Sequence, residues 1–260
     1  MRKTSREQNM KIGVIGGSGL IGRNLVDMLR EKGAEVVAAS PATGVNSVTG
    51  EGLAQALNGA QVVVDVINSP SFEDKAVMQF FDASTRNLLA ASKAAGIRHY
   101  LALSVVGTER MLESGYFRAK MAQEKLIIAS GLPYTIVRAT QFYEVITSIA
   151  NASSDGQQVR LPAALLQPVA AIDVSSALAD IVLQKPVNGM IEVAGPDKQP
   201  LYRLAEQVLR SSGDARNVVR DDGASYFGVM LNDRSLTPDE GAHIGKTTLE
   251  QWLALSAVVA

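Results

Sequence analysis

The feature of this sequence that most constrains its fold is a glycine-rich run placed directly after a short β-branched segment. The run reads Gly-Gly-Ser-Gly-Leu-Ile-Gly from Gly16 to Gly22, follows residues 12–15 and opens a helical pattern over 20–31. Glycine at Gly16 permits a tight turn, glycine at Gly19 lets the backbone approach a pyrophosphate, and glycine at Gly22 lets the helix pack close to the strand. This context predicts a dinucleotide-binding turn, and the alternative is an ordinary glycine-rich turn between a strand and a helix.

Short β-branched runs alternate with helical patterns as far as residue 138, which is typical of parallel strands joined by crossover helices. The expected strands are 12–15, 35–39, a weaker run at 45–48, 62–67, 99–103 and 134–137. The expected helices are 20–31, 52–57, 73–95 and 116–130. We therefore predict an α/β fold in which a Rossmann-type doubly wound parallel sheet spans residues 10–139.

The alternation stops after this point, and residues 140–260 contain more loop-forming residues. Asp173 is placed to cap a helix that runs to 183, and a strand at 190–193 and a helix at 201–210 follow. We expect 140–260 to form a small, loop-rich C-terminal subdomain on the substrate side, packed on the core. Residues 1–9 are polar and without periodicity, which predicts a flexible leader.

Composition and charge exclude several classes of function. The 260 residues contain 25 Lys and Arg against 26 Asp and Glu, so a broad basic surface for nucleic acid is not expected. With 0 Cys and 2 His, the chain has no cysteine nucleophile or disulfide, and no metal site is expected. No apolar run reaches the roughly 18 residues that a membrane span needs, and the polar start does not resemble a secretory signal. We expect a cytoplasmic protein with no membrane partner, while the sequence does not indicate the oligomeric state.

The end of the second expected strand bears on which nicotinamide nucleotide would bind. An acidic residue there would bond the ribose 2′-hydroxyl of NAD, but the strand 35–39 runs instead into Ser40. A serine neither requires a free hydroxyl nor repels a 2′-phosphate. Arg23, directly after Gly22, is a cation that could reach such a phosphate, although a solvated arginine in the first helical turn is the alternative. The sequence predicts NADP by a modest margin, with NAD as the alternative.

Three further residues suggest carbonyl chemistry. Ser104 ends the strand expected at 99–103, and Tyr116 and Lys120 are four residues apart on the next helix, so they share one face. Reduction of a carbonyl needs a proton donor at its oxygen, and a tyrosine serves when a lysine ammonium stabilises its phenolate. The serine hydroxyl would then hold the substrate oxygen. Because this Tyr-Lys spacing arises by chance in about a quarter of such chains, the position at the carboxyl end of a parallel strand carries the prediction. The alternative for Tyr116 is an aromatic ring that packs over the cofactor.

These three residues and the G-x-x-G-x-x-G spacing resemble the short-chain dehydrogenase/reductase superfamily. The stretches 116–142, 167–174 and 192–196 are similar to its atypical, NmrA-like branch of NAD(P)H-binding proteins. The resemblance implies that Lys120 grips the nicotinamide ribose and that Gln141 and Phe142 lie near the nicotinamide. It also implies a cofactor lining made of Ser18, Gly19, Leu20, Ile21, Asn68 and Ser69.

The resemblance leaves two functions open. Some members of the branch are enzymes that act on quinones, imines, enones or ketones, whereas others are regulators that sense the nucleotide and have lost the tyrosine. Because this chain keeps Tyr116, we expect an NAD(P)H-dependent oxidoreductase. Its substrate is expected to be a small apolar organic molecule held by Tyr143, residues 161–167 and the pair Tyr226 and Phe227. The alternative is a non-catalytic sensor that acts through a protein partner.

Two other polar residues occur in apolar surroundings. His99 opens an expected strand and is interpreted as a surface or edge histidine. Asp65 lies inside the run 62–67 and is interpreted as a strand-end carboxylate that bonds neighbouring backbone, without an assigned function.

Overall fold

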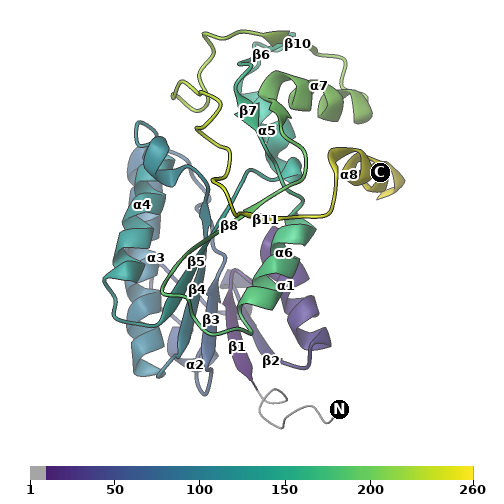
Figure 1. Ribbon diagram of the computed structural model, residues 1–260. Coiled ribbons are helices and arrows are strands. Elements are labelled where there is room, and N and C mark those ends of the chain that lie inside the picture. Colours follow the sequence, from purple (N-terminus) through teal and green to yellow (C-terminus); the bar gives the residue numbers. More distant parts are fainter. Residues whose placement is uncertain (1–9, 260) are drawn as a thin grey trace. The chain divides into compact units, whose positions relative to one another are not determined.

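A seven-stranded, mostly parallel sheet is the central element of the computed structural model, which describes residues 10–259 (Figure 1). The strand order is β11-β8-β5-β4-β3-β1-β2. The strands are β1 (Lys11–Ile15), β2 (Glu35–Ala39), β3 (Val62–Asp65), β4 (His99–Val105), β5 (Tyr134–Ala139), β8 (Gly189–Ala194) and β11 (His243–Ile244). The predicted Rossmann-type α/β fold is confirmed.

The strand order changes direction next to β1. Parallel pairing joins β1 to β2 on one side and to β3 on the other, with Ile12 opposite both Val36 and Val62. The chain thus visits one side of β1 first and then crosses to the other. In open α/β sheets ligands bind at the carboxyl ends of the strands at such a point, which here is marked by the loops that follow β1 and β3.

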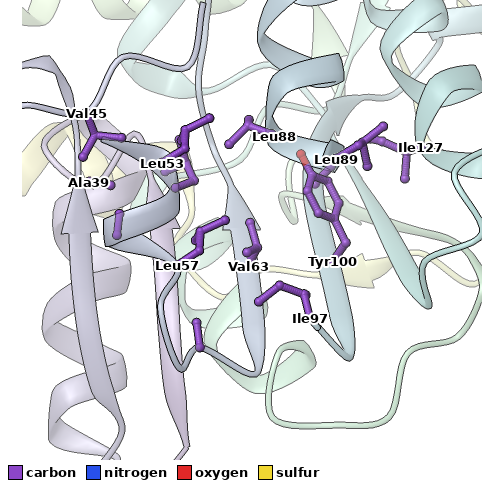
Figure 2. Close-up of a cluster of buried hydrophobic side chains, with 14 of the residues drawn as sticks. Ala39, Val45, Leu53, Leu57, Val63, Leu88, Leu89, Ile97, Tyr100 and Ile127 are labelled. Atoms are coloured by element: carbon purple, nitrogen blue, oxygen red, sulfur yellow. The ribbon is translucent and has the colours of Figure 1, made fainter. Parts of the chain in front are cut away.

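Helices cover both faces of the sheet. On one face, α2 (Leu53–Ala56), α3 (Asp74–Ala94) and α4 (Gly115–Ile128) bury apolar side chains against the strands, as Figure 2 shows. On the other face, α1 (Leu20–Glu31) lies beside α6 (Ala171–Ile181) (Figure 1). The Ser175 hydroxyl donates to the Ile21 carbonyl at 3.2 Å and Lys32 pairs with Asp180 at 3.0 Å, which ties these two helices together.

The described residues divide into two compact units. The first unit comprises 10–104, 115–138 and 175–191, and the second comprises 105–114, 139–174 and 192–259. The elements of the second unit, besides β11, are two 3₁₀ turns (Thr108–Arg110 and Tyr143–Val145), α5 (Ile146–Ala152), β6 (Gln158–Leu161), β7 (Leu165–Leu166), β9 (Gln199–Pro200), α7 (Leu201–Ser211), β10 (Asn217–Arg220) and α8 (Leu249–Val259). The expected boundary between 139 and 140 and the substrate-side role of 140–260 stay predictions. The expected leader, residues 1–9, lies outside the described residues.

Two of the predicted elements and one residue differ from the structure. Residues 45–48 form no strand, because the Asn46 side chain accepts the backbone N–H of Val48 at 2.9 Å and so bends the chain into a turn. Asp173 does not cap α6, which begins two residues earlier. Its carboxylate accepts the backbone N–H of Thr247 at 2.7 Å instead. His99 is buried rather than at a surface, and its Nε2 lies 2.9 Å from the Thr135 hydroxyl.

Candidate nucleotide-binding and catalytic site

The turn after β1 is held in place by backbone contacts from both neighbouring strands. Gly16 has a φ of +89°, in the region that favours glycine, and the backbone N–H groups of Gly16 and Gly17 both donate to the Ala39 carbonyl. A Cβ on Gly16 would lie 3.0 Å from the carbonyl of Val66, in the loop that follows β3. The glycine turn is therefore pressed against the β3 loop at the point where the strand order reverses.

The other two glycines of the motif have different surroundings. A Cβ on Gly22 would lie 2.1 Å from the Gly16 carbonyl oxygen, so α1 packs against the turn itself. Gly19 is the N-cap residue of α1, and a Cβ there would meet only that same oxygen, at 3.3 Å. Ser18, Gly19 and Leu20 are exposed, whereas the side chain of Ile21 is buried in the core. The open side of the turn thus lies along Ser18 to Leu20.

The start of α1 presents free hydrogen-bond donors to that open side. Among residues 10–259, no acceptor takes the backbone N–H groups of Ser18, Leu20 or Ile21. The first turn of α1 contains no acidic residue, and the helix dipole adds partial positive charge. Several free N–H groups at a helix N-terminus, beside a glycine without a Cβ, fit a pyrophosphate group.

The end of β2 provides a buried hydroxyl rather than a carboxylate. Ser40 is buried, and within the part of the chain that the structure describes its Oγ has no hydrogen-bond partner. Its backbone N–H donates to the Thr43 hydroxyl at 2.9 Å. Arg23 is exposed on the first turn of α1, and its side chain makes no ion pair within residues 10–259. Both residues are thus available to a polar ligand group.

Tyr116 lies in the first turn of α4, close to the β3 loop. Its hydroxyl donates to Asn68 Oδ1 at 3.3 Å, and its ring contacts Phe72 at 5.4 Å and Phe81 at 6.2 Å between centroids. Burial raises the pKa of Tyr116 well above its ordinary value of 10. The phenol therefore keeps its proton at neutral pH, and it can give that proton only to a strong base, such as the alkoxide that forms when a carbonyl accepts a hydride.

Lys120 lies on the same helix but its ammonium group points into the sheet. The Nζ donates to the Leu103 carbonyl at 2.9 Å and to Gln123 Oε1, and it lies 4.6 Å from the centre of the Phe81 ring. Burial lowers the pKa of Lys120 to about 8, against the opposing charges of two nearby carboxylates. No hydrogen bond joins Lys120 to the Tyr116 hydroxyl in the described chain. The structure thus shows no direct support of the phenol by the lysine.

Ser104 is buried at the carboxyl end of β4, and its hydroxyl already has a partner. Ser104 Oγ donates to Glu124 Oε1 at 2.5 Å. Glu124 also accepts two bonds from Arg138, at 2.7 Å and 3.0 Å, within a buried ion pair. Because a serine hydroxyl has one proton, Ser104 in this arrangement can accept a hydrogen bond from a ligand but cannot donate one.

Sequence reasoning did not single out Gln123, Glu124 or Arg138. The available signal was position. Glu124 follows Lys120 by four residues and Gln123 by three, so both lie on the buried face of α4 where apolar side chains are usual. Polar residues on that face indicate a buried network, but their partners on β3, β4 and β5 cannot be read from helical spacing.

Residues 10–259 contain neither a cluster of metal ligands nor a membrane-spanning helix. No group of three or more metal-ligating side chains is placed to hold an ion. No helix there combines the length and the apolar character that crossing a membrane requires. The expected cytoplasmic location stays a prediction.

Residues 16–185 match the family described as NAD(P)H-binding. Among curated proteins, the photosystem II assembly factor Ycf39 of Cyanophora paradoxa is 26% identical over 229 residues, covering 81% of this chain and 71% of that protein. The chloroplastic divinyl chlorophyllide a 8-vinyl-reductase of Arabidopsis thaliana is 24% identical, covering 74% of this chain and 54% of that protein. A (4-alkanoyl-5-oxo-2,5-dihydrofuran-3-yl)methyl phosphate reductase of Streptomyces griseus is 30% identical, covering 63% of this chain and 61% of that protein. The chain thus spans between about half and seven tenths of the length of these relatives.

Solved structures share the fold at low sequence identity. MoeE5 in complex with UDP-glucose and NAD superposes with a TM-score of 0.76 at 18% identity, covering 95% of this chain and 97% of that one. The NADPH-dependent quinone oxidoreductase QOR2 of Escherichia coli, complexed with NADPH, superposes with a TM-score of 0.66 at 19% identity, covering 95% of this chain and 99% of that one. These structures confirm the predicted fold, and the family match over residues 16–185 confirms the predicted binding of a nicotinamide nucleotide. The Ycf39 relatives agree with the NmrA-like branch.

Proposed function

The chain belongs to the NAD(P)H-binding family, and we propose that within it the protein is an NADPH-dependent reductase. Its substrate is a small apolar organic molecule that contains a quinone, ketone, enone or imine group. The relatives named as reductases and the quinone oxidoreductase of the same fold support this substrate class. The preference for NADPH over NADH rests on Ser40 and Arg23, since no acidic residue stands at the end of β2 to require a free 2′-hydroxyl.

The observation that carries the proposal is the protonated phenol of Tyr116 beside the β3 loop. Its hydrogen bond to Asn68 Oδ1 is long, at 3.3 Å, so the hydroxyl can turn toward a substrate atom without losing a strong contact. When bound at this site, a nicotinamide would supply the hydride that reduces the substrate. Tyr116 then gives its proton to the substrate oxygen or nitrogen and regains one from solvent. Asn68 orients the phenol before the transfer, and the free N–H groups at the start of α1 hold the pyrophosphate.

The test replaces Tyr116 by phenylalanine, which keeps the ring contacts and removes the hydroxyl. A screen of quinones, ketones, enones and imines first identifies a substrate through NADPH oxidation. Tyr116→Phe is then expected to lower kcat by roughly 10² to 10⁴, the usual size of an acid-base contribution, with NADPH affinity nearly unchanged.

Tyr134→Phe is the matched control, because Tyr134 begins β5 at the opposite, amino end of the strands. The control variant should keep full activity. Undiminished turnover in Tyr116→Phe would show that solvent or the substrate supplies the proton, and the role assigned to the phenol would be wrong.

A second candidate function is a nucleotide sensor that acts through a protein partner. Two observations favour it: the Ser104 hydroxyl donates its hydrogen bond to Glu124, and no hydrogen bond joins Lys120 to Tyr116 within the described residues. The assembly-factor relatives are in keeping with such a role. A sensor binds reduced and oxidised nucleotide with different affinities and turns over nothing in the screen. Consumption of any substrate in the screen would therefore favour the reductase over the sensor.

A further inference from the structure

A buried carboxylate behind the site has no part in the proposed reaction. Asp65 ends β3 and is 1% exposed, and Gln123 on α4 is also 1% exposed. Between them and Lys120 runs a continuous chain of hydrogen bonds through the interior of the first unit. Burying a carboxylate is costly unless its surroundings compensate, so the contacts of Asp65 need an explanation.

Every contact of Asp65 is one in which the partner donates. Tyr100 gives its hydroxyl at 2.9 Å and Gln123 its amide nitrogen at 3.1 Å, both to Oδ2, and the backbone N–H of Ile67 reaches Oδ1 at 3.2 Å. A backbone N–H and an amide NH₂ have no lone pair to offer a carboxylic acid proton. Burial raises the pKa of Asp65, and the nearby Lys120 ammonium and these three donors oppose that rise. The donor set favours the charged carboxylate.

The carboxylate in turn fixes the direction of the Gln123 amide. Because Asp65 accepts only, Gln123 must present its NH₂ to Asp65, and its carbonyl oxygen then faces Lys120. Lys120 has three N–H donors. They are directed to the Gln123 oxygen, the Leu103 carbonyl and the face of the Phe81 ring. All three directions around Nζ are therefore taken by groups that favour an ammonium ion.

We propose that Asp65 and Gln123 are positioning residues for Lys120: the carboxylate orients the amide, and the amide oxygen holds the ammonium at the carboxyl end of β4, beside the nucleotide site. The proposal rests on the proposed function in that the Lys120 ammonium places a positive charge beside the bound nucleotide there; it acts through this charge and not through a free N–H group. The arrangement keeps a buried lysine charged and in one place, which a lysine with four flexible bonds would not do unaided. Asp65 and Gln123 thus act through Lys120 and do not touch the nucleotide.

The groups around Lys120 come from every element packed against it. The titratable and charged ones are Asp65 from β3, Tyr100 from β4, Tyr116 and Glu124 from α4, and Arg138 from β5 through Glu124, while α3 contributes the Phe81 ring. Asp65 and Glu124 both raise the pKa of Lys120. Removing the Asp65 charge therefore makes the lysine lose its proton at a lower pH.

The experiment reads Lys120 directly by NMR in the full chain labelled with [13Cε]lysine, where Lys120→Met assigns the signal. In the wild-type protein Lys120 is expected to titrate near pH 8, apart from the other lysines. In Asp65→Asn and in Gln123→Met, the midpoint should fall by roughly one pH unit or more. The control is Leu29→Ala, which removes a fully buried apolar side chain of α1 on the other face of the sheet; it should lower Tm and leave the midpoint in place.

Binding and turnover complete the test. Both positioning variants should bind NADPH at least 10-fold more weakly at pH 8 than at pH 6. The affinity of the wild-type protein for NADPH should fall by a smaller factor over the same pH range. An unchanged Lys120 midpoint in Gln123→Met, the variant that leaves Asp65 intact, would overturn the proposal even if Asp65→Asn failed to fold. Midpoints that shift as expected in a protein that reduces no substrate would support the positioning role and count against the reductase alone.

Discussion

Replacing Gly19 by aspartate should weaken nucleotide binding without destabilising the fold. Gly19 has φ −76° and ψ −179°, an extended conformation that any residue adopts, and a Cβ there meets only the Gly16 oxygen at 3.3 Å. Aspartate is a favoured N-cap residue and its charge complements the helix dipole, while the first turn of α1 has no acidic residue of its own. The fold should therefore keep its Tm or gain a few degrees, as about 0.3–1 kcal/mol would give.

Nucleotide binding should respond in the opposite direction. At an effective dielectric constant of about 20, two unit charges about 5 Å apart repel by about 3 kcal/mol, which is the size expected for a carboxylate at the cap and a phosphate that the free N–H groups of α1 would hold. This corresponds to more than a 100-fold rise in Kd for NADPH. Isothermal titration calorimetry measures the effect.

Gly19→Asn supplies the control, since it adds the same volume and the same capping ability without the charge. We expect it to weaken NADPH binding clearly less than Gly19→Asp does. Equal affinities for wild type and Gly19→Asp would show that the phosphates bind elsewhere. Equal losses in the two variants would show that steric hindrance, and not the field at the helix start, controls binding.

Three further predictions follow from other contacts. Gly22→Ala places a Cβ 2.1 Å from the Gly16 oxygen, so it should destabilise the fold by about 1–3 kcal/mol, seen as a lower Tm, as well as weaken NADPH binding; an unchanged Tm would contradict the tight packing of α1 on the turn. Titrations should show tighter binding of NADPH than of NADH, and Arg23→Ala should reduce that preference; a clear preference for NADH would refute the role given to Ser40 and Arg23. Burial lowers the pKa of His99, so the unfolded chain takes up a proton below about pH 6.5 before the folded chain does, and stability should fall as the pH drops through that value. Urea unfolding between pH 8 and pH 5 should show a smaller fall for His99→Gln, and equal falls in both proteins would exclude His99 as the cause.

The elements of the fold that depend on residues close together in the sequence were, with the exceptions below, predicted correctly. The glycine run from Gly16 to Gly22, the β-branched strands and the helix stretches each depend on residues close together in the chain. The error at 45–48 arose because Asn46 competes for the backbone through a turn, which a count of β-branched residues does not register. Asp173 was misplaced because its partner, Thr247, lies 74 residues further along the chain.

The residues of the candidate site could be proposed from the sequence, and their roles stay predictions, whereas the contacts among them could not be predicted. Helical spacing placed Tyr116 and Lys120 on one face, and the same spacing holds for Glu124. Which acceptor a lysine finds depends on the elements packed against its helix, so the Leu103 carbonyl and Gln123 could not be foreseen. The bond from Asp65 to neighbouring backbone, here the Ile67 N–H, was predicted, whereas the connection of Asp65 to Lys120 through Gln123 required the assembled sheet.

The most direct test of the reductase function follows the hydride itself. NADPH carrying deuterium at the transferable C4 position is incubated with the protein and the substrate found in the screen. The mass of the product is then measured by mass spectrometry. A reductase that acts on a ketone, enone or imine yields product that has gained one carbon-bound deuterium per molecule as the NADPH is consumed. With a quinone, the deuterium exchanges from the hydroquinone into solvent, so the readout is unlabelled NADP⁺ formed in equal amount with hydroquinone. NADPH that binds with the expected affinity while no compound in the screen is reduced and no label leaves the NADPH would contradict the reductase function and leave nucleotide sensing in its place.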